Sequence, residues 1–412
     1  MSNVDLALAI GSGLVLVLGL FSDTIKRFWL SEPMLAMAVG ILLGLVLPTF
    51  LDYSAETIRE DYLELGARLT LAVGVMAAAL RLPKRYFARH KGRMLVLLGL
   101  IMPIMWLSST GLLLAVMGWP FWTALLAGAI ITPTDPVLAS SIVTGRIAEK
   151  YLPQSVREAL TAESGANDGL AYPFVFFALL FVANEASGAG MAVSLARIIF
   201  WEVGFAVLVG GILGYAAGKL LDWAESKRSI EGTSFLAYTV ALSLLVLGVC
   251  GLLGSSGILG VFVSGIMFAR VVPTPERRDE ERVQEAVNRF LLLPVFLLFG
   301  FTLPLDDWGD VGWLCVALVA GILLLRRLPG MLAVRPLLGS LKEWPTSLSL
   351  GWFGPIGVAA MFYAMAAQRI APSADIWPAV SLVIFSSVIV HGLTATPLAT
   401  LYGRWQKSSS AT

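Results

Sequence analysis

Long apolar runs recur along almost the whole chain, and they restrict its fold more than any other feature of the sequence. A run of about 20 apolar residues spans the hydrocarbon core of a bilayer as an α-helix. Charged residues make up only 14% of the 412 residues, whereas soluble domains carry roughly 25%. This composition excludes a cytosolic enzyme, a disulfide-rich scaffold and a disordered protein. The net charge of +1 argues against nucleic acid as a partner, so we predict an all-α polytopic membrane protein embedded in a lipid bilayer.

About thirteen segments are long and apolar enough to be membrane-spanning helices. In chain order they are residues 4–21, 33–50, 66–82, 94–117, 121–144, 157–183, 192–222, 234–253, 257–271, 287–304, 311–337, 346–367 and 376–402. The count is open by one around 94–117 or 257–271. Residues 52–65 are too polar to span a membrane and are predicted to form a short amphipathic surface helix.

Positively charged residues concentrate in alternate loops, which predicts the orientation of the chain. The basic loops contain Lys84, Arg85, Arg89, Lys91, Arg93, Lys227, Arg228, Arg270, Arg277, Arg278 and Arg282, and the C-terminal end contains Arg404 and Lys407. The loops between them are acidic or poor in Lys and Arg. We therefore expect a multi-pass protein of the plasma (inner) membrane, with its N-terminus outside and its C-terminus in the cytoplasm. This orientation requires an odd number of spans.

Ionisable residues inside membrane spans are costly and usually mark the pathway of an ion or a proton. They are densest in the fifth and sixth predicted spans. The fifth contains Asp135 within TPTDPV, and the sixth contains Glu163, Asn167 and Asp168 within ESGANDG. These side chains are therefore the first candidates for a cation- and proton-binding site.

Other polar residues in the spans carry a weaker signal. His391 in the last span is expected to be an interhelical histidine with its hydrogen bonds satisfied, although it could also line an ion path. Arg197 and Glu202 fall near the end of a span, where snorkelling or interfacial pairing is the usual explanation.

Two predicted spans contain clusters of helix-breaking residues. In the fifth span, prolines flank Thr134 and Asp135, which removes two backbone donors and disfavours a continuous helix. The twelfth span carries GWFGPIG, in which three glycines and a proline fall together. Irregular backbone at membrane depth survives only where it lines a cavity. Paired breaks in two halves indicate a transporter with inverted repeats; spans 1–6 and 8–13 would be the halves, linked by span 7.

The stretches TPTDPV, ESGANDGLAYPF and GWFGPIGV together resemble those of monovalent cation/proton antiporters. They are most similar to the NhaP-like, electroneutral branch that includes the Na+/H+ exchangers, and within it to fungal plasma-membrane Na+/H+ antiporters and their bacterial relatives. The resemblance implies a transporter that is not an enzyme, with two broken helices that cross, and a homodimer. It also implies one transmembrane domain over 1–402, with core spans in 94–183 and 311–402, scaffold spans in 4–82 and 192–304, and a short cytoplasmic tail over 403–412.

The resemblance also assigns roles to individual residues. Asp168 would carry the cation and the proton in alternation, with Thr134 and Ser164 as further oxygen ligands of Na+. Asp135 would balance the dipoles of the crossed broken helices, and Asn167 would hold that crossing together by hydrogen bonds.

An ion pair between the sixth and eleventh spans is also implied. Glu163 would help to coordinate the cation, directly or through water, and would pair with an arginine of the eleventh span. That span contains Arg326 and Arg327, and we favour Arg327; adjacent residues on a helix point about 100° apart, so only one of them can face Glu163. Many relatives carry an arginine where this chain has Ile356, so no contact of that arginine is expected.

A mechanism follows from counting charges. A buried carboxylate is disfavoured in its charged form, so a cation and a proton compete for Asp168, and the neutralised site crosses a low-dielectric barrier more readily than the empty one. Related transporters have two adjacent aspartates where this chain has Asn167 and Asp168. With Glu163 compensated by arginine, one titrating charge remains, which predicts exchange of one Na+ (or Li+) for one H+. No cofactor is implied beyond these transported ions.

Other functions remain open at this point. Within transporters, the alternative is K+/H+ or broad monovalent cation/H+ exchange, because ion selectivity depends on cavity dimensions. A remote alternative is an intramembrane aspartyl protease that uses Asp135 and Asp168 as a dyad, although neither acid lies in the sequence context of such enzymes. An ion channel is a further alternative, but nothing in the chain resembles a pore loop.

Overall fold

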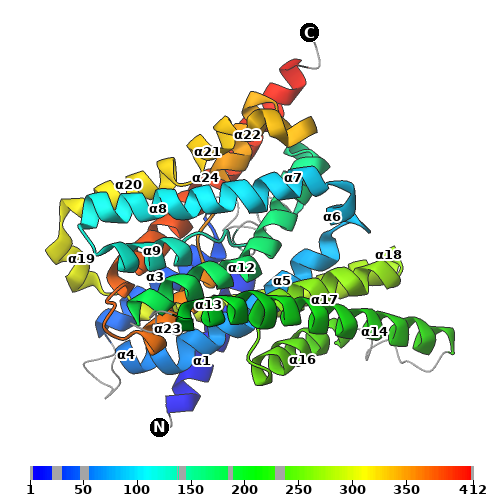
Figure 1. The fold of residues 1–412 in the computed structure, drawn as a ribbon, viewed down its shortest axis with the longest axis horizontal. Helices are drawn as coiled ribbons and strands as arrows, with labels where there is room; N and C mark the ends of the chain where they lie inside the picture. Colours follow the sequence, from blue (N-terminus) through cyan, green and yellow to red (C-terminus); the bar gives the residue numbers. More distant parts are fainter. Residues whose placement is uncertain are drawn as a thin grey trace.

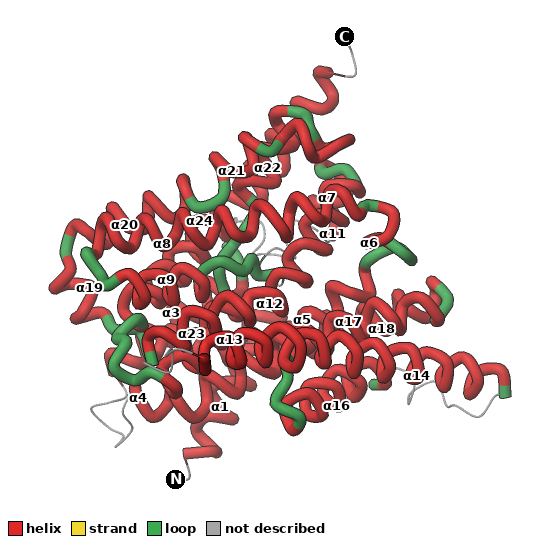
Figure 2. Tube along the Cα trace, viewed as in Figure 1, coloured by secondary structure: helices red, strands yellow, loops and turns green. Residues whose placement is uncertain are grey.

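The fold is helical throughout the part of the chain that the structure describes. In this computed structural model the described residues are 3–20, 30–46, 55–136, 138, 145–183, 189–227 and 237–409, and they contain helices and loops but no strand. Figures 1 and 2 show these helices packed side by side in one bundle. The predicted all-α fold class is therefore confirmed.

In the N-terminal part of the bundle, the described residues form three continuous helices. Their bounds are α1 (Asn3–Leu20), α3 (Glu32–Val46), and α4 (Ala55–Ile58), which continues through the π-helical segment η2 (Arg59–Leu63) into α5 (Glu64–Arg81). The sequence predicted a separate surface helix over 52–65. The described part of this segment instead runs without a break into α5. Its last residues continue α5 because Leu63 is fully buried in the bundle.

The next helices lead to the first break. They are α6 (Tyr86–Arg89), α7 (Lys91–Val96), η3 (Leu97–Ile101), α8 (Met102–Met117), α9 (Phe121–Ile130), α11 (Gly145–Tyr151) and α12 (Gln154–Val182). Gly118 ends α8 in the left-handed conformation that suits glycine at a helix C-terminus. The second half of predicted span 121–144 lies largely outside the described residues.

The remaining helices complete the bundle. They are α13 (Ala189–Ala196), η4 (Arg197–Phe205), α14 (Ala206–Ser226), α16 (Tyr238–Leu252), α17 (Gly257–Val271), α18 (Thr274–Phe301), α19 (Leu305–Val311), α20 (Trp313–Leu325), α21 (Leu328–Ala333), η5 (Arg335–Leu341), α22 (Trp344–Trp352), α23 (Val358–Ile370) and α24 (Trp377–Ser409). Helix α24 continues through Gly403, which packs against Tyr151. Most of the predicted polar tail is therefore helical, and only its last three residues lie outside the described part.

Six described helices are long and apolar enough to cross a membrane. They are Lys91–Met117, Gln154–Val182, Gly190–Ala224, Glu281–Phe301, Trp313–Ala333 and Trp377–Gln406, and five shorter apolar helices accompany them. Each of the six overlaps one of the predicted spans. The chain is thus a multi-pass membrane protein, while the total of thirteen spans stays a prediction.

Both predicted helix breaks are present. After α9 the backbone is non-helical from residue 131 to residue 136, and between α22 and α23 it is non-helical from Phe353 to Gly357. A third interruption was not predicted: α20 ends before Arg326 and Arg327, and α21 begins after them. The two arginines therefore lie at a bend and not along one continuous helix.

Helices α5 and α12 make many of the helix–helix contacts around the two breaks. Helix α5 packs against α12, α17, α18 and α23, and α12 packs against α9, α5 and α17. Helices α8 and α20 lie side by side on one edge of the bundle, and α14, α16 and α17 lie together on the other (Figure 1). Helix α12, which carries four of the candidate site residues, contacts α8 through Phe174 and Trp106 and also packs against α17.

Glycines allow a close contact between α3 and α18. A Cβ atom at Gly300 of α18 would meet the backbone carbonyl of Met37 on α3, and one at Gly40 of α3 would meet the carbonyl of Leu297. Small residues let membrane helices approach in this way, and the packing gained replaces the hydrophobic driving force that lipid does not supply.

Replacing Gly300 by alanine should therefore destabilise the protein. The new methyl group has to push backbone away from backbone, and overpacking of this kind costs about 1–3 kcal/mol. Thermal unfolding of the purified protein in detergent measures the effect. Gly248→Ala in α16 is the matched control, because nothing lies within 4 Å of a Cβ there. Equal melting temperatures for the two variants would contradict the close contact.

Candidate functional site

The two broken helices contact each other through their backbones. The Asp135 N–H donates to the carbonyl of Pro355 at 2.8 Å. The Asp135 carboxylate accepts hydrogen bonds from the N–H groups of Val358, at 2.6 Å, and Leu138, at 3.1 Å. Val358 is the first residue of α23, whose free N–H groups carry partial positive charge. Asp135 thus caps this helix from the other break.

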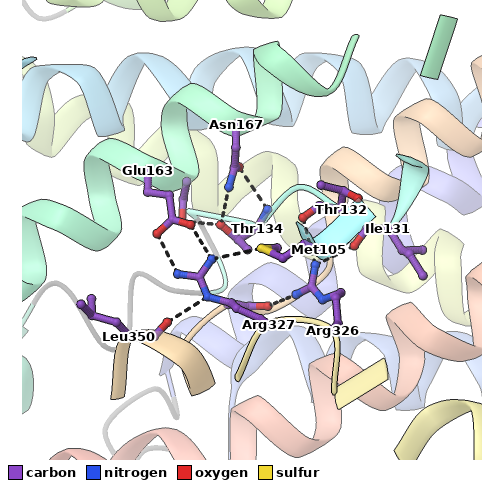
Figure 3. A network of polar contacts seen from close by, with 11 residues as sticks. Met105, Ile131, Thr132, Thr134, Glu163, Asn167, Arg326, Arg327 and Leu350 are labelled. Carbon is purple, nitrogen blue, oxygen red and sulfur yellow. Dashed lines mark hydrogen bonds and ion pairs between the residues drawn. The ribbon is translucent and has the colours of Figure 1, made fainter. Parts of the chain in front are cut away.

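Arg326 stabilises the C-terminal ends of the two helices that lead into the breaks, α9 and α22. Its guanidinium group donates to the carbonyl oxygens of Ile131, at 2.6 Å, and Thr132, at 2.9 Å, and also to that of Gly354. These carbonyls follow the C-terminal ends of α9 and α22, which carry partial negative charge. The Arg326 side chain is buried between the two breaks (Figure 3). This role of Arg326 was not predicted, and the only signal for it in the sequence is the pair of arginines within an apolar run.

Arg327, the next residue, points to a different partner. Its guanidinium group forms a two-pronged ion pair with Glu163 of α12, in which Nη2 lies 2.7 Å from Oε2 and Nη1 contacts Oε1. Its Nε donates to the Leu350 carbonyl at 2.9 Å, and Nη1 lies against the sulfur of Met105. Both charged side chains are almost fully buried. Figure 3 shows Arg326 and Arg327 turned to opposite partners from adjacent positions.

A cluster of polar oxygens lies beside this ion pair. The Thr134 hydroxyl is 2.9 Å from the Ser164 hydroxyl and accepts a hydrogen bond from the Asn167 amide at 2.9 Å. The Asn167 carbonyl oxygen in turn accepts from the Thr134 backbone N–H at 3.1 Å. Asn167 therefore ties α12 to the first break through two hydrogen bonds, and the three side chains are all buried.

Asp168 differs from every other acid of this region. Its side chain is fully buried, and neither carboxylate oxygen has a hydrogen-bond partner. Its backbone carbonyl accepts a hydrogen bond from the Tyr363 hydroxyl of α23 at 2.6 Å. An unpaired carboxylate in a membrane interior is costly unless a proton or a cation neutralises it. Asp168 is thus the one site acid in the described part of the chain with an unsatisfied carboxylate.

Two residues of α24 support the second break. The Ser387 hydroxyl accepts from the Ile356 N–H at 2.7 Å, and the His391 ring contacts Ser387 through Nδ1 and the Trp352 carbonyl through Nε2, at 3.0 Å. The structure thus shows His391 as an interhelical histidine with both ring nitrogens engaged. Ser387 was not predicted, and the only signal for it in the sequence is its position one helical turn before His391.

The eight predicted site residues lie at one place in the bundle. Thr134 and Asp135 come from the first break, and Arg326 and Arg327 come from the bend before α21. Glu163, Ser164, Asn167 and Asp168 come from α12. Within the described residues, no group of three His, Cys, Asp or Glu side chains is arranged to hold a metal ion. The donors gathered here are instead hydroxyl, amide and carboxylate oxygens, which suit a hard cation.

Buried charge around two crossing broken helices, within a multi-pass helical bundle, defines a secondary transporter. Residues 13–401 match the family described as sodium/hydrogen exchanger, transmembrane, so the chain belongs to that family of transporters and is not an enzyme. The protease alternative is thereby excluded. Its proposed dyad also fails on geometry, since Asp135 is engaged in capping α23.

Several known proteins are similar to the chain. It is 32% identical to Na+/H+ antiporter 2 of Zygosaccharomyces rouxii, over 89% of this chain and 49% of that protein. It is 30% identical to a Na+/H+ antiporter of Schizosaccharomyces pombe, over 95% of this chain and 89% of that protein. The chain therefore spans about half the length of the first relative and most of the second.

The fold also has a solved counterpart. The sodium proton antiporter MjNhaP1 from Methanocaldococcus jannaschii superposes with a TM-score of 0.74, over 97% of this chain and 99% of that chain, at 18% identity. This likeness confirms the all-helical, polytopic fold of the chain.

Removing the charge of Glu163 should destabilise the protein strongly. In Glu163→Gln the Arg327 guanidinium stays buried without its counter-ion, and breaking a buried pair in this way costs about 3–5 kcal/mol. The double variant Glu163→Gln/Arg327→Gln removes both charges and should recover part of the loss. Thermal unfolding in detergent measures both.

The control is an ion pair of the same type near the surface. Arg369→Gln removes the partner of Glu64 where the arginine side chain is 67% exposed, and exposed pairs contribute less than about 1 kcal/mol. If Glu163→Gln melted as high as Arg369→Gln, the buried pair would contribute no more than the exposed one.

Proposed function

We propose that this protein is a secondary active antiporter that exchanges Na+ (or Li+) for H+ by alternating access. The single observation that carries the proposal is the buried Asp168 carboxylate, whose two oxygens have no hydrogen-bond partner among the described residues. A transported ion supplies the neutralising partner. The fungal relatives are Na+/H+ antiporters, which supports the same cation for this protein.

Competition at Asp168 accounts for coupling. The carboxylate binds either a proton or a cation, and either one removes the charge that opposes movement of the site through a low-dielectric barrier. Thr134 and Ser164, with their hydroxyls 2.9 Å apart, are the proposed additional oxygen ligands of Na+. The empty site keeps its charge and stays in place, so the two ions move only in exchange.

The proposed stoichiometry is one cation for one proton. Glu163 is neutralised by Arg327, Asp135 is held by the N-terminus of α23, and Arg326 is held by backbone carbonyls. Asp168 is then the only carboxylate of the site left to change its charge during a cycle. Transport moves no net charge under this scheme.

One observation favours K+ as an alternative transported cation. The chain is 28% identical to the K+/H+ antiporter NhaP2 of Shewanella oneidensis, over 95% of this chain and 66% of that protein. K+/H+ or broad monovalent cation/H+ exchange is therefore the alternative. Comparing Na+, Li+ and K+ in one vesicle assay separates the two.

The proposal includes the arrangement of the protein in the membrane. We propose a protein of the plasma (inner) membrane with the N-terminus outside and the C-terminus in the cytoplasm, supported by the alternation of basic and acidic loops. The division into a core (94–183 and 311–402) and a scaffold (4–82 and 192–304) is supported by the position of all eight site residues in the core. The scaffold would form the homodimer interface.

Asp168→Asn should abolish exchange. Asparagine keeps the size of the side chain but holds neither a proton nor the charge that attracts a cation. Dequenching of a pH-sensitive dye in proteoliposomes, after addition of Na+, Li+ or K+, measures the exchange. Asp306→Asn, an exposed acid of α19, is the control and should exchange like the wild type. Cation-dependent proton flux in a folded Asp168→Asn protein would refute the role of Asp168.

Exchange should also be electroneutral. A K+ diffusion potential of either sign, imposed across proteoliposomes without a Na+ or pH gradient, should produce no proton movement and should leave the initial rate of Na+/H+ exchange unchanged. The reason is that one positive charge crosses in each direction. A rate that follows the imposed potential would contradict the one-to-one stoichiometry while leaving antiport itself intact.

A further inference from the structure

A second buried carboxylate lies outside the site described above. Glu202 of η4 is 7% exposed, and its Oε1 lies 3.3 Å from Nε of Arg197, whose own side chain is 69% exposed. In a regular α-helix, side chains five residues apart point about 140° away from each other. The π-helical hydrogen bonding of η4, from residue i to residue i+5, brings the two side chains to the same face.

The ion pair leaves half of the carboxylate unsatisfied. Glu202 Oε2 is buried and has no hydrogen-bond partner. The N–H of Ser256 donates to the Glu202 carbonyl at 2.9 Å, and the Ser256 hydroxyl is likewise buried without a partner. A buried polar atom without a partner requires an explanation, such as a bound water or ion. An acid inside a membrane span is by default a functional candidate.

Hydroxyl groups connect this carboxylate to the region of Asp168. Tyr172 follows Asp168 by one helical turn on α12, and its hydroxyl faces the Glu202 carboxylate. Tyr363 donates to the Asp168 carbonyl and lies near Tyr172. Tyr172 and Glu202 therefore lie on the side of Asp168 toward the end of α12 at Val182. Figure 1 shows α13, which leads into η4, alongside α12, and η4 itself packs against that helix.

We propose that Glu202 is an accessory binding group for the transported ion, a carboxylate that holds a proton or a hydrated monovalent cation between Asp168 and the membrane face at which α12 ends. Oε1 is held by Arg197, which keeps the carboxylate in place. Oε2 and the Tyr172 hydroxyl are the groups that receive the ion. The inference rests on the proposed antiport, and it adds a second ion-binding residue to the route.

The experiment measures the concentration of Na+ that gives half-maximal exchange in proteoliposomes at one fixed pH. In Glu202→Gln this concentration should rise about tenfold, which is the effect of losing about 1.4 kcal/mol of binding, while the maximal rate changes little because Asp168 is intact. Tyr172→Phe removes only a hydroxyl and should shift the concentration in the same direction by a smaller factor.

The matched control is Glu32, a carboxylate that also pairs with an arginine but lies on neither α12 nor η4. Glu32 of α3 forms a two-pronged ion pair with Arg289 of α18, at 2.6 and 2.7 Å. A purely structural ion pair affects the amount of folded protein and not the dependence of its rate on Na+. Glu32→Gln should therefore leave the half-maximal concentration unchanged.

The possible results separate the inference from the function on which it rests. A wild-type protein without cation-driven proton flux would refute both. An active wild type with the same half-maximal Na+ concentration in Glu202→Gln, or an equal shift in Glu32→Gln, would refute the role of Glu202 alone. If Glu202→Gln does not fold, Tyr172→Phe decides, because it keeps the ion pair: an unchanged concentration there overturns the inference.

Discussion

The rest of the structure depends on how the backbone groups of two broken helices are satisfied inside the membrane. Each break exposes N–H and C=O groups where no water is available to hydrogen-bond them. Asp135 caps the N-terminus of α23, and Arg326 collects the carbonyls that follow α9 and α22. One negative and one positive side chain thus neutralise opposite ends of the same crossing, which makes irregular backbone tolerable at this depth.

Asp135 and Arg326 neutralise the helix ends, so the other charged side chains of the site can be considered separately. Glu163 and Arg327 neutralise each other, and Asn167 and Thr134 join α12 to the first break. The Asp168 carboxylate is buried and has no hydrogen-bond partner among the described residues, while the contacts of Asn167 and Thr134 hold its helix in place. A site with one unpaired charge favours exchange of one ion for another, because any single monovalent cation restores neutrality. Glu202 extends the same principle toward one end of α12.

Much of this arrangement was predictable from local sequence. Proline and glycine interrupt helices wherever they cluster, so TPTDPV and GWFGPIG predicted the two breaks that the structure contains. The acids of α12 stood out because ionisable side chains are rare in apolar spans. Pro329, which lies in the first turn of α21, was a signal for the bend at Arg326 that the prediction of one continuous span over 311–337 did not use. The π-helical segment η4 was not predictable, because a single Gly204 does not distinguish a π-helix from an α-helix.

The sequence by itself determined that the chain crosses a membrane many times, where its helices break, and which acids lie at membrane depth. Membrane spans and helix breaks depend on the residues of a single segment, so they can be predicted from the local sequence. Only the tertiary structure decided that Arg327 faces Glu163 while Arg326 faces the carbonyls, and that Ser387 and His391 support the second break. Which partner a buried polar group finds depends on the rotation and packing of neighbouring helices, and those are properties of the assembled bundle.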